Sequence, residues 1–187
     1  DPLLDAAGNA AAGVHVSGAA GDDLVIGVRD DNGAGSLELH LASPGGGWST
    51  SAAATLALPD GLAATALFPF SSTPHGPPDR LLVAAATDAD PGASDYCDDY
   101  DTPGQALVIS VTPSSLQIAS RGTLPALTYC DALRAWAVST MVQGSSNLLL
   151  FQDGENVAEG PNDGDMSLYV LDPANGLAAQ PVGMAPF

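Results

Sequence analysis

The sequence predicts an all-β protein built from antiparallel four-stranded units. Two observations lead to this prediction. Short apolar or alternating segments are separated by turn signals at regular spacing, and no long segment has helical periodicity. In addition, one pattern occurs three times along the chain: an apolar strand, a polar loop, an alternating strand and a tight turn. A unit of strands that repeats along a chain indicates architecture before any single residue does.

The clearest copy of this pattern lies near the end of the chain. It begins with an apolar strand at 148–151, continues through an acidic loop from Asp153 to Asp165 and an alternating strand at 167–171, and ends in a turn at 172–176. The other two copies have apolar strands at 24–28 and 81–85, alternating strands at 37–41 and 106–111, and turns at 43–47 and 112–115.

Each unit gains one further strand on either side of the pattern. First strands are expected at 14–16, 62–70 and 133–141, and last strands at 50–58, 116–124 and 177–182. Residues 51–58 have some helical propensity, but Pro59-Asp60-Gly61 would end a helix early, and a strand fits the repeat better. The predicted organisation is an irregular lead at 1–13, followed by a single β domain over 14–187 with units at about 14–58, 62–126 and 132–182.

The repeated unit resembles the blades of β-propeller proteins. The apolar inner strand and the Leu-Tyr-Val-Leu-Asp-Pro-Ala-Asn-Gly strand and turn at 168–176 are similar to those of the broad group with PQQ-type, kelch-like and FG-GAP-like repeats. The chain has no Trp-Asp ending, no Gly-Gly kelch pair and no full Asp-x-Asp-x-Asp-Gly loop, so no subfamily function follows. Propellers have four to eight blades. Three units therefore predict part of a larger propeller or an assembly of copies, and the alternative is a β-sandwich.

The charge of the chain limits its partners. The formal net charge is −18, with 22 acidic residues against four arginines and no lysine. Such a chain repels phosphate groups, so nucleic acid and anionic membrane surfaces are poor partners. Cations, protein partners and further copies or blades of the same assembly fit better. No apolar run approaches the roughly 20 residues that a transmembrane helix needs, so no membrane span is expected.

The two cysteines, Cys97 and Cys130, both lie in acidic segments. In a blade arrangement, Cys97 falls between the second and third strands of the middle unit, and Cys130 falls in the connection to the next unit. Loops of these two classes emerge on the same face, so we predict a Cys97–Cys130 disulfide that stabilises the fold by about 3 kcal/mol. The disulfide implies an oxidising compartment, and therefore a secreted, extracellular or cell-surface protein. Two free thiols in a cytosolic protein are the alternative.

Acidic residues gather in the loops between the second and third strands of the units. Calcium takes six to eight oxygen ligands, and alternating carboxylates beside a sharp turn can supply some of them. The best local fits are Asp88 and Asp90 in the middle unit, and Asp163 and Asp165 in the last unit. These four residues are the candidate calcium ligands, and no other cofactor is expected. A solvated acidic loop without a metal explains the same residues.

The sequence predicts no catalytic residue. His15, His40 and His75 have no short metal-binding spacing, and no Gly-x-Ser-x-Gly sequence occurs. Five aromatic residues could form a surface that stacks against carbohydrate: Trp48, Trp136, Tyr96, Tyr100 and Tyr129. Trp136 alternates with apolar residues in a predicted strand and is expected in the core, which leaves tyrosines as the candidates for that surface. These are Tyr96, Tyr100 and Tyr129.

Together these features favour a non-enzymatic extracellular module with a structural or interaction role. It would scaffold or recognise a partner through its acidic loop face, within a surface or filamentous assembly. The alternative is a secreted calcium-dependent propeller enzyme, a hydrolase or lyase in which a metal activates water. A secreted binding protein of a halophile is a third interpretation, and it would unfold at low ionic strength.

Overall fold

The computed structural model describes residues 10–30, 33–73, 76–86, 105–123, 134–140, 148–155, 164–172 and 177–186; within 134–171 and 178–186 it describes the backbone. This part of the chain is almost entirely β-strand, with a single turn of 3-10 helix at Pro59–Gly61. The all-β prediction is therefore confirmed. The described strands form three antiparallel sheets of four strands each.

In each sheet the strands are neighbours in the order in which they occur in the chain. The first sheet contains β1 (Ala11–Val14), β2 (Asp23–Arg29), β3 (Gly35–His40) and β4 (Ala54–Ala57). The second contains β5 (Ala63–Phe70), β6 (Arg80–Ala86), β7 (Gln105–Thr112) and β8 (Ser115–Thr123). The third contains β9 (Arg134–Thr140), β10 (Leu148–Glu155), β11 (Gly164–Asp172) and β12 (Ala178–Pro186). All twelve strands overlap the ranges that the sequence predicts.

Two predicted boundaries are wrong. The first strand begins at Ala11, inside the predicted irregular lead, because Ala12 and Val14 are buried and their backbone pairs with β2. In the third sheet, the ladder continues past the apolar residues and pairs Gly154 with Asp165. Asp165 therefore lies in a strand and not in the acidic loop, because backbone pairing does not require apolar side chains.

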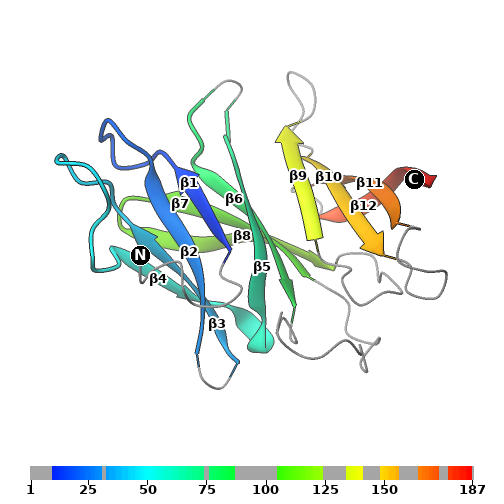
Figure 1. The fold of residues 1–187 in the computed structure, drawn as a ribbon, viewed down its shortest axis with the longest axis horizontal. Coiled ribbons are helices and arrows are strands. Elements are labelled where there is room, and N and C mark those ends of the chain that lie inside the picture. Colours follow the sequence, from blue (N-terminus) through cyan, green and yellow to red (C-terminus); the bar gives the residue numbers. More distant parts are fainter. Residues whose placement is uncertain are drawn as a thin grey trace.

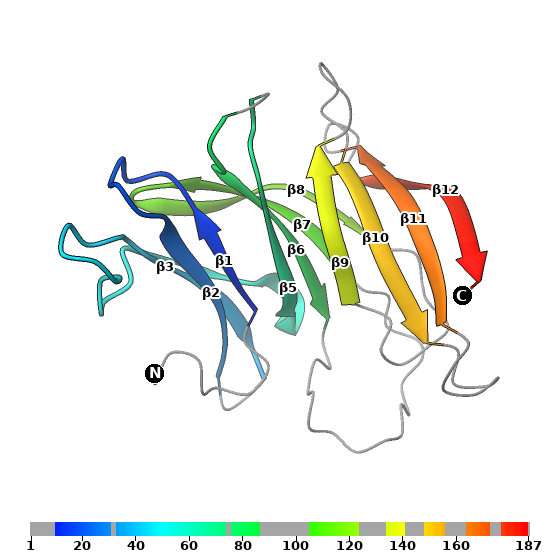
Figure 2. The ribbon, with the colours of Figure 1, turned by 45° about the horizontal axis from the view of Figure 1, so that its top comes forward.

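The three sheets lie side by side, with the second sheet between the other two (Figure 1 and Figure 2). Their first strands are neighbours, because β5 contacts both β1 and β9. Their last strands are also neighbours, because β8 contacts both β4 and β12. The sheets are therefore stacked with their strands in the same order, and in the described part of the chain they form an open row, not a closed ring.

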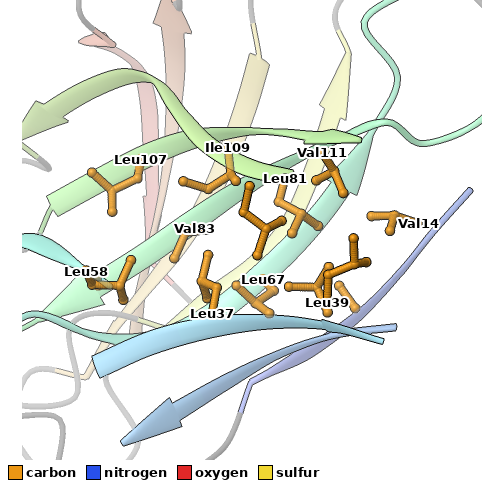
Figure 3. Packing of buried hydrophobic residues seen from close by; sticks show 14 of the residues in the cluster. Val14, Leu37, Leu39, Leu58, Leu67, Leu81, Val83, Leu107, Ile109 and Val111 are labelled. Carbon is orange, nitrogen blue, oxygen red and sulfur yellow. The ribbon is translucent and has the colours of Figure 1, made fainter. Parts of the chain in front are cut away.

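The hydrophobic core between the first and second sheets is built from alternate residues of the facing strands (Figure 3). Side chains in a strand point alternately to the two faces of the sheet, so every second residue reaches this core. Its fully buried leucine and isoleucine side chains are Leu37 and Leu39 of β3, Leu81 of β6, and Leu107 and Ile109 of β7. Burial of one such side chain stabilises the fold by roughly 1.5–3 kcal/mol.

The second sheet is buried on both faces. Leu82 and Ala84 of β6, and Ala106 and Val108 of β7, alternate with the core residues and are also buried. Because side chains alternate along a strand, they point away from the core shared with the first sheet. The third sheet lies on that side of the second (Figure 2). A strand covered on both faces has a continuous apolar sequence without alternation. This explains why the run Leu81–Ala85 has no polar residue.

Gly35, at the start of β3, brings the first two sheets into close backbone contact. Its amide donates to the Leu62 carbonyl at 3.1 Å, and its carbonyl accepts from the Leu58 amide at 2.9 Å. A Cβ at this position would lie 2.4 Å from the Leu62 oxygen and 2.6 Å from the Ala63 Cα. Only glycine fits here without moving the backbone.

Candidate functional site

The best-defined polar region lies at one end of the first sheet. The β1–β2 loop, residues 15–22, and the β3–β4 loop, residues 41–53, leave the same edge of this sheet because alternate strands are antiparallel. We call these two loops together the loop edge. The second strand of each sheet ends, and the third begins, at the opposite edge. The acidic loops that the sequence singles out connect these strand ends and lie largely outside the described residues.

A buried carboxylate, that of Asp23, holds the two loops together. Asp23 is 0% exposed. One of its oxygens accepts hydrogen bonds from the backbone amides of Val16 at 3.0 Å and Ser17 at 2.8 Å, and the other accepts from the Ala42 amide at 2.8 Å. Three backbone donors that would otherwise lack partners are thereby satisfied. Asp23 is a structural residue of the loop edge.

The hydrogen bonds to Asp23 also decide its ionisation. Burial raises the pKa of a carboxyl group, because burial disfavours the charged form. The hydrogen bonds from Ala42, Ser17 and Val16 favour the charged form, and their combined effect is the greater. The pKa of Asp23 is therefore lowered from its ordinary value of 3.8. The carboxylate stays ionised at neutral pH despite its burial.

Trp48 follows a tight turn in the β3–β4 loop. The Gly46 amide donates to the Ser43 carbonyl at 2.9 Å, and the Ser43 amide donates to the Gly47 carbonyl at 3.0 Å. Gly46 and Gly47 have φ angles of 91° and 74°, which favour glycine. The sequence prediction of a turn at 43–47 is confirmed. An isolated bridge between Ala42 and Trp48 closes it.

The indole of Trp48 is anchored but partly exposed to solvent. Its Nε1 donates a hydrogen bond to the Asp22 carbonyl at 2.8 Å, across 26 positions of the sequence. The residue is nevertheless 45% exposed, the more exposed of the two large hydrophobic residues that the described part of the chain leaves uncovered. The Nε1 edge of the ring is thus fixed by a hydrogen bond, and nearly half of the residue's surface is accessible to solvent.

Asp22, which holds the Trp48 indole through its backbone carbonyl, also lies close to His15. The Asp22 side chain is 69% exposed, and its Oδ1 lies 3.5 Å from Nδ1 of His15. The amide of His15 donates to the Pro78 carbonyl at 2.7 Å. That bond ties the β1–β2 loop to the equivalent connection of the second sheet, so the loop edge is supported by both sheets.

His40 supports the β3–β4 loop from beneath. Its ring is buried, and Nδ1 lies 2.9 Å from the Ser49 carbonyl. A carbonyl only accepts hydrogen bonds, so Nδ1 carries the proton. Nε2 lies 3.3 Å from Oε2 of Glu38. The sequence indicates no role for His40, because it does not show which loop folds over this residue.

The predicted site residues fall mostly outside the described residues. This holds for Cys97, Cys130, Asp88, Asp90, Asp163, His75 and the three tyrosines. Asp165 lies in β11, where its backbone pairs with Gly154 of β10 and Pro186 of β12. The disulfide and the calcium site therefore stay predictions. Among the side chains that the structure describes, no group of three His, Cys, Asp or Glu residues is placed to hold a metal.

From the sequence, only the tyrosines remain candidates for a ligand-stacking surface, although Trp48 is the exposed aromatic residue among those described. The exposure of Trp48 could have been predicted from its position directly after Gly45-Gly46-Gly47. A tryptophan beside a glycine turn has few bulky neighbours in the sequence that could cover it. The hydrogen bond from Trp48 to Asp22 could not be predicted from the local sequence, because the sheet brings together the two loops that carry these residues.

Comparison with known proteins gave no match to a family model, to a curated protein or to a solved structure. In the described residues, no helix has the length and apolar character required to cross a membrane. The proposals below therefore stand on the geometry of the loop edge and on the stacking of the sheets.

Proposed function

We propose that the chain is a non-enzymatic interaction module whose three sheets are consecutive blades of a β-propeller. The observation that carries the architecture is the common order of the stacked sheets. First strands contact first strands through β1, β5 and β9, and last strands contact last strands through β4, β8 and β12. Radially arranged blades have this order. In a two-sheet sandwich, each sheet buries only the face that it turns to the other sheet. Here the second sheet is buried on both faces.

The interaction role is supported by the way the loop edge is built. Buried polar groups at this edge serve the loops themselves: Asp23 binds three amides, and His40 binds the Ser49 carbonyl. The exposed groups, Trp48 and Asp22, are held in place by these contacts. Preorganised exposed residues bind with a smaller entropic cost than mobile ones. The arrangement suits recognition of a partner.

We further propose that the module works outside the cell, with the Cys97–Cys130 disulfide intact and within a larger assembly. The two cysteines are the main support for this location, since a disulfide persists in an oxidising compartment. The predicted acidic face, with Asp88, Asp90, Asp163 and Asp165 as its calcium ligands, would be a second surface at the opposite edge of the sheets.

Site-specific crosslinking tests the interaction role. A photoreactive phenylalanine replaces Thr50 in the β3–β4 loop, and in a second variant it replaces Gln117 of β8. Both positions are exposed. We expect a defined adduct with one protein, identified by mass spectrometry in extracts of the source organism, from position 50 only. Equal adducts from both positions, or none from position 50, would contradict recognition through the loop edge.

A further inference from the structure

We propose that Trp48 and Asp22 form a site for a cationic side chain, an arginine or lysine carried by a basic segment of a partner protein. This inference rests on the proposed interaction function and adds the chemical class of the partner. The two residues are adjacent in space because the Asp22 carbonyl accepts the Trp48 indole hydrogen bond at 2.8 Å.

The state of the indole limits what it can recognise. Its single donor, Nε1–H, is already bound within the protein. A ligand therefore meets the π-surface of the ring and not its hydrogen-bonding edge. The face of a tryptophan attracts cations, arginine most often, and this attraction increases where water is partly excluded. A hydrogen-bonding ligand gains less here, because the donor is already occupied.

Asp22, whose backbone carbonyl holds the ring, carries a side chain of the matching sign. The Asp22 side chain is 69% exposed and accepts charge-assisted hydrogen bonds well. The group facing it is His15, whose Nδ1 lies 3.5 Å from Oδ1. The net charge of −18 adds long-range attraction for a basic segment.

The surroundings of the ring leave room for a chain segment. A Cβ added to Gly18 of the β1–β2 loop, or to Gly45, Gly46 or Gly47 of the β3–β4 loop, would meet no atom within 4 Å. The glycines on both loops therefore border open space. An extended peptide that places one arginine on Trp48 meets no bulky side chain at these positions.

Fluorescence anisotropy with a labelled Gly-Arg-Gly-Arg-Gly peptide tests the proposal. Its control is the same peptide with citrulline, which keeps the shape of arginine but lacks the charge. We expect saturable binding of the arginine peptide and at least a tenfold weaker affinity for the citrulline peptide. Trp48→Ala should weaken binding about tenfold, and Trp48→Phe should weaken it less, because phenylalanine keeps an aromatic face.

Asp22→Asn gives an independent test that leaves the indole contact intact, since that contact uses the Asp22 backbone. We expect several-fold weaker binding and a smaller dependence on salt. The matched control is Asp60→Asn, which removes the same charge at the opposite edge of the sheet, where Asp60 pairs with Arg121 at 2.5 Å. This control should bind the peptide as the unmodified protein does.

Two results would overturn the inference. If Trp48→Ala, Asp22→Asn and Asp60→Asn all bind the peptide equally, the attraction comes from the net charge and there is no site. If a neutral oligosaccharide such as cellohexaose binds in a Trp48-dependent manner and the arginine peptide does not, the ligand is a glycan. Either result leaves the crosslinking at position 50 to decide the interaction function separately.

Discussion

Asp23 and Asp79 occupy equivalent positions in successive sheets. Each lies two residues before the first buried core residue of the second strand, Val25 or Leu81. Asp23 binds the amides of Val16 and Ser17 in the preceding loop. The carboxylate of Asp79 likewise accepts two hydrogen bonds from Ser72. One comes from the Ser72 amide at 2.6 Å, and the other comes from the Ser72 hydroxyl. In the first two sheets, the first hairpin is thus closed by a carboxylate at or just before the start of the second strand.

The first prediction concerns the stability that Asp23 contributes. Asp23→Asn keeps the size of the side chain but places an amide group against backbone donors. We expect a loss of about 2 kcal/mol in the free energy of unfolding, because a buried hydrogen bond to a charged group is lost. The measurement is urea denaturation at neutral pH. The neighbouring substitution Asp22→Asn, at an exposed side chain, is the control and should change stability by less than about 0.5 kcal/mol.

The second prediction concerns the pH dependence of the same residue. The pKa of Asp23 is lower in the folded chain than its ordinary value of 3.8. Its ionised form therefore stabilises the fold above that value, and this contribution is lost as the pH falls through the folded pKa. The stability difference between the unmodified protein and Asp23→Asn should be constant from about pH 7 to pH 5 and should shrink below about pH 4. A stability difference that grows as the pH falls would contradict the lowered pKa of Asp23.

The third prediction tests the backbone contact between the first two sheets. Gly35→Ala would place a Cβ 2.4 Å from the Leu62 oxygen. We expect a destabilisation of about 2–3 kcal/mol, because main-chain atoms must move. Gly45→Ala is the matched control, since a Cβ there meets nothing within 4 Å. Thermal unfolding should distinguish the two variants clearly. Equal melting temperatures would mean that the sheets can separate at Gly35 without cost.

The fourth prediction concerns the two cysteines. If Cys97 and Cys130 are joined, the intact mass of native material should increase by two hydrogens on reduction, and neither thiol should react with iodoacetamide before reduction. Removal of the disulfide should cost about 3 kcal/mol. Rapid alkylation of both residues in native material would instead favour a reducing compartment and remove the main support for an extracellular location.

The fifth prediction concerns calcium. The candidate ligands are Asp88, Asp90, Asp163 and Asp165. If they bind the ion, calcium should raise the melting temperature of the unmodified protein, because a ligand that binds only the folded state stabilises it. Substitution of the four residues by Asn should abolish that increase. An unchanged response to calcium in the substituted protein would remove these residues as ligands.

Strand positions could be predicted from the sequence because they depend on local patterns. The run Leu81–Ala85 and the alternation at 167–171 each mark a strand without reference to the rest of the chain. The loop edge could not be predicted in this way. Asp22 and Asp23 are identical neighbours, yet one side chain is 69% exposed and the other residue is 0% exposed. The difference arises because Ala42, 19 positions away, is brought to Asp23 by the pairing of β2 with β3.

Burial of the second sheet on both faces has a consequence for synthesis of the chain. A protein leaves the ribosome from its N-terminus, so β1 to β8 emerge before β9 does. The first and second sheets can then form their shared core. Leu82 and Val108 alternate with the residues of that core and lie on the other face of the second sheet. The third sheet, which lies on that side (Figure 2), has yet to arrive. During that interval the nascent chain displays an apolar sheet surface. Protection of this apolar surface by a chaperone would matter most until residues 134–186 have emerged from the ribosome.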